Sequence, residues 1–437
     1  MHAFRIWLDR LAQSPNYKWV VVGLLFFSGF LNLEDRVVIF SVMPLIRQEL
    51  TLSDFQIGAL MTAFLWTYAL SSPFAGFFGD RVARKRILVG CLILWSLVTF
   101  AVGLVTSAGQ LVAARVLLAI TEAFYIPASL AIVADYHTKS TRAKAVAVLV
   151  IGMNLGPILG GAAAGWIGDH YGWRPVLLIL GGIGILLASV QFVFLREVAM
   201  GASDAAAGKS YGTAVPLARP VALGATIREL LGTPSYVLMV LSVGIVAIGV
   251  WMLITWLPLF LVETFKMSLA QSGFWGNLAI TGSVFISALA GGALSDFVGA
   301  KQPRRRMLLM VVFYALVLPW PLLFFAAKSV TVVLVSIFLF QLCRGMAELN
   351  SFPLIYELVP PDKRSTAVGI SNCVNTIFGG GGALVVGYFK SSLGFQTVFG
   401  LVPAMIAISV GCLLIGYLKF LPRDLARRGA VAPAEPS

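Results

Sequence analysis

Twelve runs of about 20 mostly apolar residues follow one another along the chain, separated by short polar breaks. Each run is long enough to cross the ~30 Å hydrocarbon core of a bilayer as an α-helix. Charged residues make up only 12% of the 437 residues, whereas soluble domains carry about 25%. We therefore predict an all-α membrane protein with spans near 19–46, 54–78, 87–107, 110–133, 144–168, 174–195, 235–263, 270–296, 306–327, 330–357, 365–388 and 396–418.

One long polar break, at 196–233, divides these spans into two sets of six. It is rich in small residues and prolines and carries mixed charges, a composition typical of a linker. We therefore predict five parts: an N-terminal cytoplasmic or interfacial segment (1–18), a first six-helix half (19–195), a cytoplasmic linker (196–233), a second six-helix half (234–420) and a cytoplasmic tail (421–437).

The two halves resemble each other when the first is shifted by 222 positions along the chain. Under this shift three residues of the first half meet residues of the same type or charge in the second, namely Asp135 and Glu357, Arg142 and Arg364, and Gly160 and Gly382. A repeat of this kind predicts two halves of the same topology.

The distribution of basic residues predicts the orientation. Of the 32 Lys and Arg residues, 24 fall in the two termini and in the loops after the second, fourth, sixth, eighth and tenth spans. Loops that carry Lys and Arg remain in the cytoplasm, so both termini are expected there. In a bacterium this corresponds to a multi-pass protein of the inner membrane.

The first span contains three consecutive charged residues, Glu34, Asp35 and Arg36. Each charge costs a few kcal/mol at the bilayer centre, so the three together indicate a functional site. Asn32, Asp35 and Arg36 are spaced i, i+3 and i+4, which predicts that they share one helix face. Glu34 lies about 200° from Asn32 around the helix. We expect it to pair with a neighbouring helix or to extend toward the membrane surface.

Two further spans carry charges at helical spacing. Arg115 and Glu122 lie two turns apart in the fourth span, and the tenth span places a second polar group on one face. Either these residues form buried ion pairs that hold helices together, or they take part in transport. We favour transport for Arg36, Asp35 and Glu122, and leave both interpretations open for Arg115, Arg344 and Glu348. The second polar group consists of Gln341, Arg344 and Glu348.

The eleventh span adds Asn372 and Asn375, which share a face and are followed by four glycines. In a membrane helix, such asparagines either bind neighbouring helices or donate hydrogen bonds to a substrate, and both alternatives stay open.

The sequence contains no pattern that indicates an enzyme, a cofactor or a metal site. The four cysteines lie in apolar spans without metal-type spacing, and the three histidines lie near span ends or the N-terminus. We expect no cofactor and no nucleic-acid partner, and a protein that works as a monomer. A channel or a receptor derived from a transporter is left open.

The loop "GDRVARKR" (79–86) resembles the signature loop of the major facilitator superfamily, and two six-helix halves joined by a long loop are the layout of that superfamily. The resemblance covers nearly the whole chain and implies a transporter that works by alternating access. It also implies a charge latch that breaks and reforms between states, whereas a solvated loop that fixes topology is the simpler interpretation. The predicted latch residues are Asp80, Arg81, Arg84 and Arg86.

The pattern N-x-x-D-R in the first span, the stretch "FLWTYALSSPFAGFFGDR" (64–81) and R-x6-E in the fourth span resemble the anion:cation symporters. That resemblance implies proton-coupled transport of a small organic anion such as a sugar acid. Arg36 would bind the substrate carboxylate, with a hydroxyl from Tyr68. The wider predicted set is Asn32, Arg115, Gln341, Arg344, Asn372 and Asn375 for substrate binding, with Asp35, Glu122 and Glu348 for proton coupling.

The stretches "GDRVARKR" and "TEAFYIPASLAIVADYH" (121–137) also resemble Spinster-type transporters, which carry lysolipids or related amphiphiles. Glu34 departs from both patterns. We favour the organic anion, because the predicted spans hold more polar groups than a cavity for an acyl chain would need, and each unpaired polar group in an apolar site costs free energy.

Overall fold

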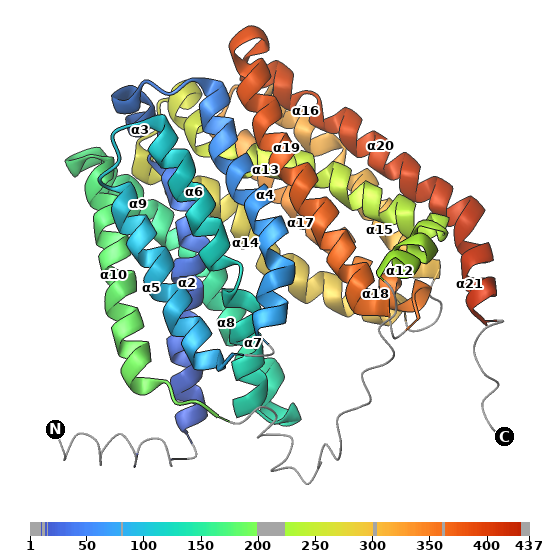
Figure 1. The fold of residues 1–437 in the computed structure, drawn as a ribbon. Helices are drawn as coiled ribbons and strands as arrows, with labels where there is room; N and C mark the ends of the chain where they lie inside the picture. Colours follow the sequence, from blue (N-terminus) through green and yellow to red (C-terminus); the bar gives the residue numbers. More distant parts are fainter. Residues whose placement is uncertain are drawn as a thin grey trace. The chain divides into compact units, whose positions relative to one another are not determined.

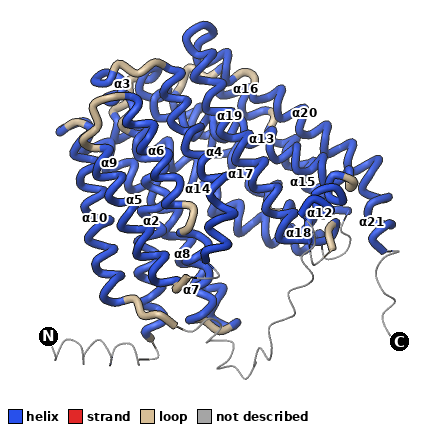
Figure 2. The backbone as a smooth tube through the Cα atoms, viewed as in Figure 1, coloured by secondary structure: helices blue, strands red, loops and turns tan. Residues whose placement is uncertain are grey.

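The computed structural model describes residues 10, 14, 16–79, 82–198, 223–299, 304–360 and 363–429, and these residues form helices joined by short loops (Figure 2). Most of the predicted linker, most of the N-terminal segment, the end of the tail, and the latch residues Asp80 and Arg81 lie outside the described residues. Eleven helical stretches in the described ranges are long and apolar enough to cross a membrane. The one predicted span that is not among these eleven is the first, which corresponds to α2. This helix has 25 residues but carries the three consecutive charges.

The first six spans form ten helical elements, which Figure 1 shows in blue to green. Several spans consist of two or three helical elements in succession. The elements are α2 (Tyr17–Ser41), α3 (Met43–Leu50), α4 (Asp54–Gly79), α5 (Arg84–Val102), α6 (Ala108–Glu122), α7 (Tyr125–Tyr136), α8 (Lys139–Leu155), the π-helical turn η1 (Gly156–Gly160), α9 (Gly161–Tyr171) and α10 (Trp173–Phe194).

The later elements repeat this pattern of long and broken helices. They are α12 (Leu223–Leu231), α13 (Pro234–Phe265), α14 (Leu269–Gly299), α15 (Arg304–Val317), α16 (Pro319–Ala326), α17 (Val330–Glu348), α18 (Ser351–Leu358), α19 (Arg364–Phe399), α20 (Val402–Ile415), η3 (Gly416–Phe420) and α21 (Leu421–Gly429). α19 contains a kink at Gly394, where φ is 76°.

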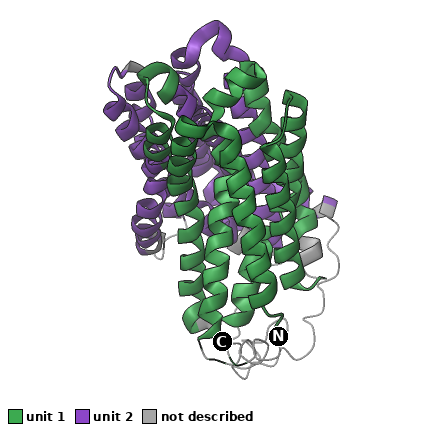
Figure 3. Cartoon of the chain, turned by 90° about the vertical axis from the view of Figure 1, so that its left-hand side faces the viewer, with its two compact units in different colours: residues 1–214, 261–277 green, residues 215–260, 278–437 purple. Residues whose placement is uncertain are grey.

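The chain forms two compact units, shown in different colours in Figure 3. Unit 1 comprises residues 1–214 and 261–277, and unit 2 comprises 215–260 and 278–437. Within unit 1, segment 261–277 is held by charged side chains. Arg47 Nη1 lies 2.8 Å from Glu263 Oε1, and the Asp169 carboxylate accepts the backbone N–H groups of Leu269 and Ala270, each at 3.1 Å. Segment 261–277, which the sequence places in the second six-helix half, therefore belongs to unit 1.

Contacts within each unit reproduce the predicted 222-residue repeat. Arg84 pairs with Asp135 in unit 1, and Arg306 pairs with Glu357 in unit 2, where Arg306 Nε lies 3.0 Å from Glu357 Oε1. Each of these residues has a partner in the other unit 222 positions away. The repeat that was read from the sequence is therefore confirmed by equivalent ion pairs.

A second pair of equivalent contacts closes the turn after each broken span. The Arg142 guanidinium donates to the backbone carbonyls of His137 and Ala134, and Arg364 donates to those of Val359 and Tyr356. Each arginine thereby satisfies carbonyls at a helix C-terminus that have no partner within the helix. Two glycines with positive φ in the described part of the chain, Gly172 and Gly394, are also 222 positions apart.

We predict that Asp135→Ala lowers the unfolding temperature of the purified protein by several degrees, because it leaves the Arg84 guanidinium without its carboxylate in a partly buried setting. Asp135 is 6% exposed, and breaking a buried pair costs about 3 kcal/mol or more. Glu357→Ala is the matched control at the equivalent position. Its side chain is 24% exposed, so we expect a smaller loss. Equal effects in thermal unfolding would contradict the role of burial.

Candidate functional site

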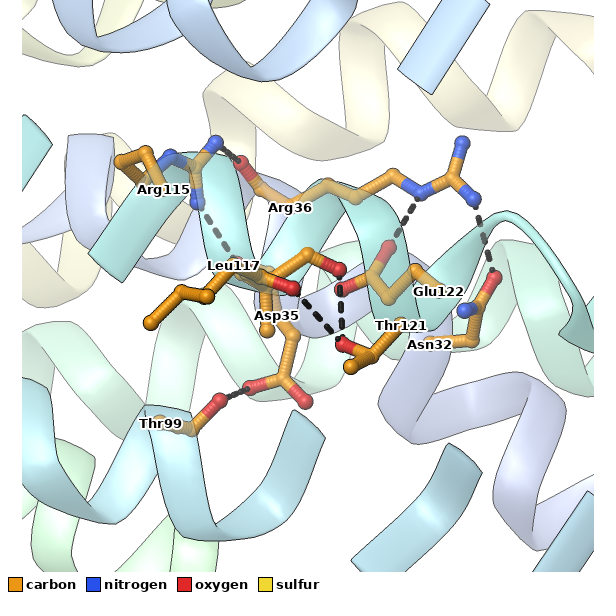
Figure 4. Close-up of polar contacts among 9 residues, drawn as sticks. Asn32, Asp35, Arg36, Thr99, Arg115, Leu117, Thr121 and Glu122 are labelled. Carbon is orange, nitrogen blue, oxygen red and sulfur yellow. Dashed lines mark hydrogen bonds and ion pairs between the residues drawn. The ribbon is translucent and has the colours of Figure 1, made fainter. Parts of the chain in front are cut away.

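A cluster of buried polar side chains joins α2 to α6 within unit 1 (Figure 4). Arg36 donates from Nε to Glu122 Oε2 at 2.8 Å and from Nη2 to Asn32 Oδ1 at 3.2 Å. Asn32 and Arg36 meet because they are four residues apart on α2. The Glu122 side chain is fully buried and that of Arg36 is 11% exposed. The structure thus brings together three of the predicted site residues.

The donors and acceptors of this cluster are not all used. Among the described residues, Glu122 Oε1 and Asn32 Nδ2 have no hydrogen-bond partner. A buried polar atom without a partner is costly, so such atoms mark places where a ligand, an ion or a water can bind.

Two aromatic rings of α4 flank the Arg36 guanidinium. Its Cζ atom lies 4.5 Å from the ring centroid of Tyr68 and 5.6 Å from that of Phe64, and the two rings are stacked. A planar guanidinium is attracted to an aromatic face and is held there in a defined orientation. Tyr68 was predicted to contribute through its hydroxyl group, and the structure adds a contact through its ring. Phe64 was not predicted, because nothing distinguishes it from other apolar residues of the span.

Arg115 contacts the backbone of α2 next to the cluster. It donates to the carbonyl oxygen of Asp35 at 3.2 Å and to that of Arg36 at 2.9 Å, and its Cζ atom lies 4.7 Å from the Phe64 ring centroid. Arg115 is 2% exposed. Arg115 thereby holds the backbone of α2 in place, and its contact with substrate stays a prediction.

The Asp35 carboxylate points away from Arg36, toward α5 (Figure 4). Its Oδ1 atom accepts a hydrogen bond from Thr99 Oγ1 at 3.0 Å. The prediction that Asn32, Asp35 and Arg36 share one face is therefore wrong for Asp35, because consecutive residues on a helix diverge by about 100°. Thr99 was not predicted; its hydroxyl in an otherwise apolar stretch was the only signal in the sequence.

Glu34 points in yet another direction, as the sequence indicated, but it neither pairs with a neighbouring helix nor reaches the surface. It is fully buried, and neither carboxylate oxygen has a hydrogen-bond partner among the described residues. Its carboxyl group packs against Gly160 of η1.

Unit 2 contains the second predicted group. On α17, Arg344 Nη1 lies 2.6 Å from Glu348 Oε2, which confirms that these two residues share a face. Gln341 is 1% exposed, and its Oε1 atom lacks a partner within the described part of the chain. On α19, Asn372 is exposed and Asn375 is half-buried.

The described latch residues lie at the N-terminus of α5. Arg84 pairs with Asp135 of α7 and also donates to the carbonyl of Ala131 at 2.9 Å. The backbone N–H groups of Arg84 and Lys85 are accepted by the Glu197 carboxylate, each at 3.1 Å. A carboxylate at this position satisfies N–H groups that have no partner within the helix. The Arg86 side chain is exposed.

Known proteins of several kinds resemble this chain. An "MFS-type efflux pump" of Mycolicibacterium smegmatis is 29% identical over 383 residues, which is 87% of this chain and 86% of the relative. A "Probable galactarate/D-glucarate transporter GarP" of Escherichia coli is 24% identical over 88% of this chain and 91% of the relative. "Protein spinster homolog 1" of Homo sapiens is 28% identical over 57% of this chain and 47% of the relative.

A solved structure and a family model agree on the fold. The structure of a bacterial homologue of the human lysosomal transporter Spinster, in an inward-facing and unoccupied conformation, matches with a TM-score of 0.83 at 22% identity, over 96% of this chain and all of that chain. The model of the Major Facilitator Superfamily matches residues 25–383 and 292–436. Three observations point to the same family: the buried charged cluster on interrupted helices, the two repeated halves and the match to this family model. The chain belongs to the Major Facilitator Superfamily of transporters, which are not enzymes.

Proposed function

We propose that this protein is a secondary active transporter that moves a small organic anion, a sugar acid or another carboxylate, together with protons. The observation that carries the proposal is the ion pair between Arg36 and Glu122. Arg36 is a permanently charged group in a nearly dry setting, and its partner is a carboxylate of the kind that the substrate itself would offer.

The coupling follows from competition for one guanidinium. When a substrate carboxylate binds Arg36, Glu122 loses its counter-ion. A fully buried carboxylate without a counter-ion is very costly, so Glu122 takes up a proton instead. When the substrate leaves, Arg36 again attracts the Glu122 carboxylate, and the proton is released. Substrate and proton are thereby bound together and released together.

The surrounding residues prepare Arg36 for this exchange. Arg115 fixes the backbone of α2 through the carbonyls of Asp35 and Arg36, and the rings of Phe64 and Tyr68 orient the guanidinium plane. Preorganisation of this kind lowers the cost of ordering the site when the substrate binds.

The similarity to the galactarate/D-glucarate transporter supports an organic anion as the substrate. The similarity to Spinster homologue 1, at a comparable level of identity over a shorter stretch, supports the second candidate, an amphiphile such as a lysolipid. We favour the anion, because the cluster at Arg36 offers a cation, an amide and unpaired polar atoms in one place.

Purified protein in proteoliposomes tests the choice directly. We expect uptake of labelled galactarate, glucarate or a simpler carboxylate when the outside is acidic, and loss of this uptake when a protonophore is added. A labelled lysophospholipid serves as the competing substrate. Movement of the lysophospholipid with a proton gradient, together with no uptake of any carboxylate, would replace the anion by the amphiphile.

A further inference from the structure

A groove of about 680 Å³ lies within unit 1 and is lined by α2, η1, α9 and α10. We call it the lateral groove. Its walls are apolar apart from Glu34, and its rim includes Phe27, Leu159 and Leu186, which are 58%, 50% and 66% exposed. An exposed apolar surface of this kind is suited to contact acyl chains rather than water. The volume of the lateral groove is typical of small-molecule sites.

Glu34 is the single ionisable residue among those that line the lateral groove. It is fully buried, and both carboxylate oxygens lack a hydrogen-bond partner among the described residues. The two arginines of the Arg36 cluster are engaged elsewhere, since Arg36 binds Glu122 and Asn32, and Arg115 binds backbone carbonyls of α2. A carboxylate buried without a counter-ion or a donor is among the costliest arrangements in a protein, and it indicates a missing partner.

The local backbone is shaped to receive this carboxyl group. η1 is a π-helical turn, a deviation that occurs frequently at functional sites. A Cβ atom added to Gly160 would lie 2.1 Å from Glu34 Cδ, and one added to Gly156 would lie 2.2 Å from the carbonyl oxygen of Phe30. Glycine at both positions lets η1 approach α2 closely and leaves a notch that the Glu34 carboxyl group fills.

We propose that the lateral groove binds an amphiphilic amine, a molecule with one ammonium group and a single apolar chain or ring system. Once the Glu34 carboxyl group turns from the notch toward the groove, the ammonium group would supply the counter-ion and the N–H donors that Glu34 lacks, and the apolar body would occupy the groove. A ligand with further polar groups is disfavoured, because the walls offer nothing to bind them. This site is distinct from the Arg36 cluster and takes the opposite charge.

The depth of Glu34 distinguishes a free amine from a lipid headgroup. Glu34 lies seven residues before Ser41, the last residue of α2, which corresponds to about 10 Å along the helix. A phospholipid amine remains at the level of the headgroups, near the helix ends. The ligand that fits is therefore a free, single-chain amine that enters the groove from the bilayer interior.

Photo-labelling of the full-length protein in phosphatidylcholine nanodiscs tests the proposal. The probe is dodecylamine with a diazirine in its chain, and the matched control probe is the same chain ending in an alcohol. We expect the amine probe to label peptides of α9 and α10, and excess dodecylamine, but not dodecanol, to compete. Glu34→Gln should reduce labelling by the amine about tenfold or more and leave labelling by the alcohol unchanged, since the amide keeps the size of the side chain and removes the charge.

Ala163→Phe provides a second variant that does not touch Glu34. Ala163 is an exposed residue of the groove wall, so a larger side chain should fill the groove without disturbing the core. Labelling by the amine probe should fall. Amine labelling that survives in Glu34→Gln, or that dodecanol competes equally well, would overturn the proposal and leave an unspecific lipid-facing surface. Suppression by phosphatidylethanolamine added to the nanodiscs would overturn the assignment to a free amine.

Discussion

Replacing Arg36 with Lys is expected to lower the affinity for the transported anion by about tenfold or more, while the protein still folds and inserts. Hydrogen bonds to charged groups contribute about 1.5–3 kcal/mol each, and Lys cannot reproduce the paired donors of a guanidinium. The ammonium group would also lose the stacking on Tyr68 and Phe64. Substrate-induced thermal stabilisation of the purified variant measures the loss.

Arg174→Lys is a suitable control for this experiment. Arg174 also binds a carboxylate, with Nη2 at 2.7 Å from Glu49 Oε1, but this pair is 31% and 48% exposed and lies outside the cluster. Substrate affinity in this variant should equal that of the wild type. An Arg36→Lys protein with unchanged affinity would remove Arg36 from the binding site and, with it, the observation on which the proposed function depends.

Replacing Glu122 with Gln is expected to abolish uptake driven by a pH gradient and to preserve exchange of substrate between the two sides of loaded vesicles. Gln keeps an oxygen that can accept the Arg36 N–H at 2.8 Å, but it cannot bind and release a proton. Exchange requires no net movement of protons, so it should continue. Parallel measurements of gradient-driven uptake and of counterflow separate the two processes.

Glu49→Gln is the matched change at a carboxylate that also binds an arginine but lies in α3, outside the predicted spans. Its hydrogen bonds to Arg174 and Trp173 hold the pKa of Glu49 below its ordinary value, so Glu49 keeps its charge throughout the range in which transport is measured. We expect both uptake and exchange to persist in this variant. Loss of both activities in a folded Glu122→Gln protein would make Glu122 a structural residue or a direct ligand.

The two acidic neighbours of Arg36 would then have different roles. Asp35 is bound by Thr99 of α5, and Glu34 lies in the lateral groove, so neither contacts the Arg36 guanidinium that Glu122 holds. The three consecutive charges of the first span thus point toward three different helices. One short stretch of α2 thereby contributes to the proposed anion site, to the packing of α2 against α5 and to the proposed amine site.

The sequence by itself determined the class of fold and indicated charged residues that the structure brings together at Arg36 and Glu122. Long apolar runs fix membrane-spanning helices, because a bilayer leaves few other ways to satisfy the backbone. The 222-residue repeat predicted that Asp135 and Glu357 are equivalent, and the structure places both in equivalent ion pairs. Arg36 and Glu122 stood out because charges are rare and costly in such helices. Spacing alone also predicted the contact between Arg36 and Asn32.

Only the tertiary structure decided what each charge contacts. Helical spacing gives the direction of a side chain relative to its own helix, but the neighbour in that direction depends on how the helices pack. The role of Arg115 was therefore left open by the sequence, and the structure shows that it binds the carbonyls of α2. Asp35 was assigned to the face of Arg36 and is bound by Thr99. Glu34 was expected to pair or to reach the surface, whereas the close approach of η1 leaves it buried against Gly160 and without a partner among the described residues.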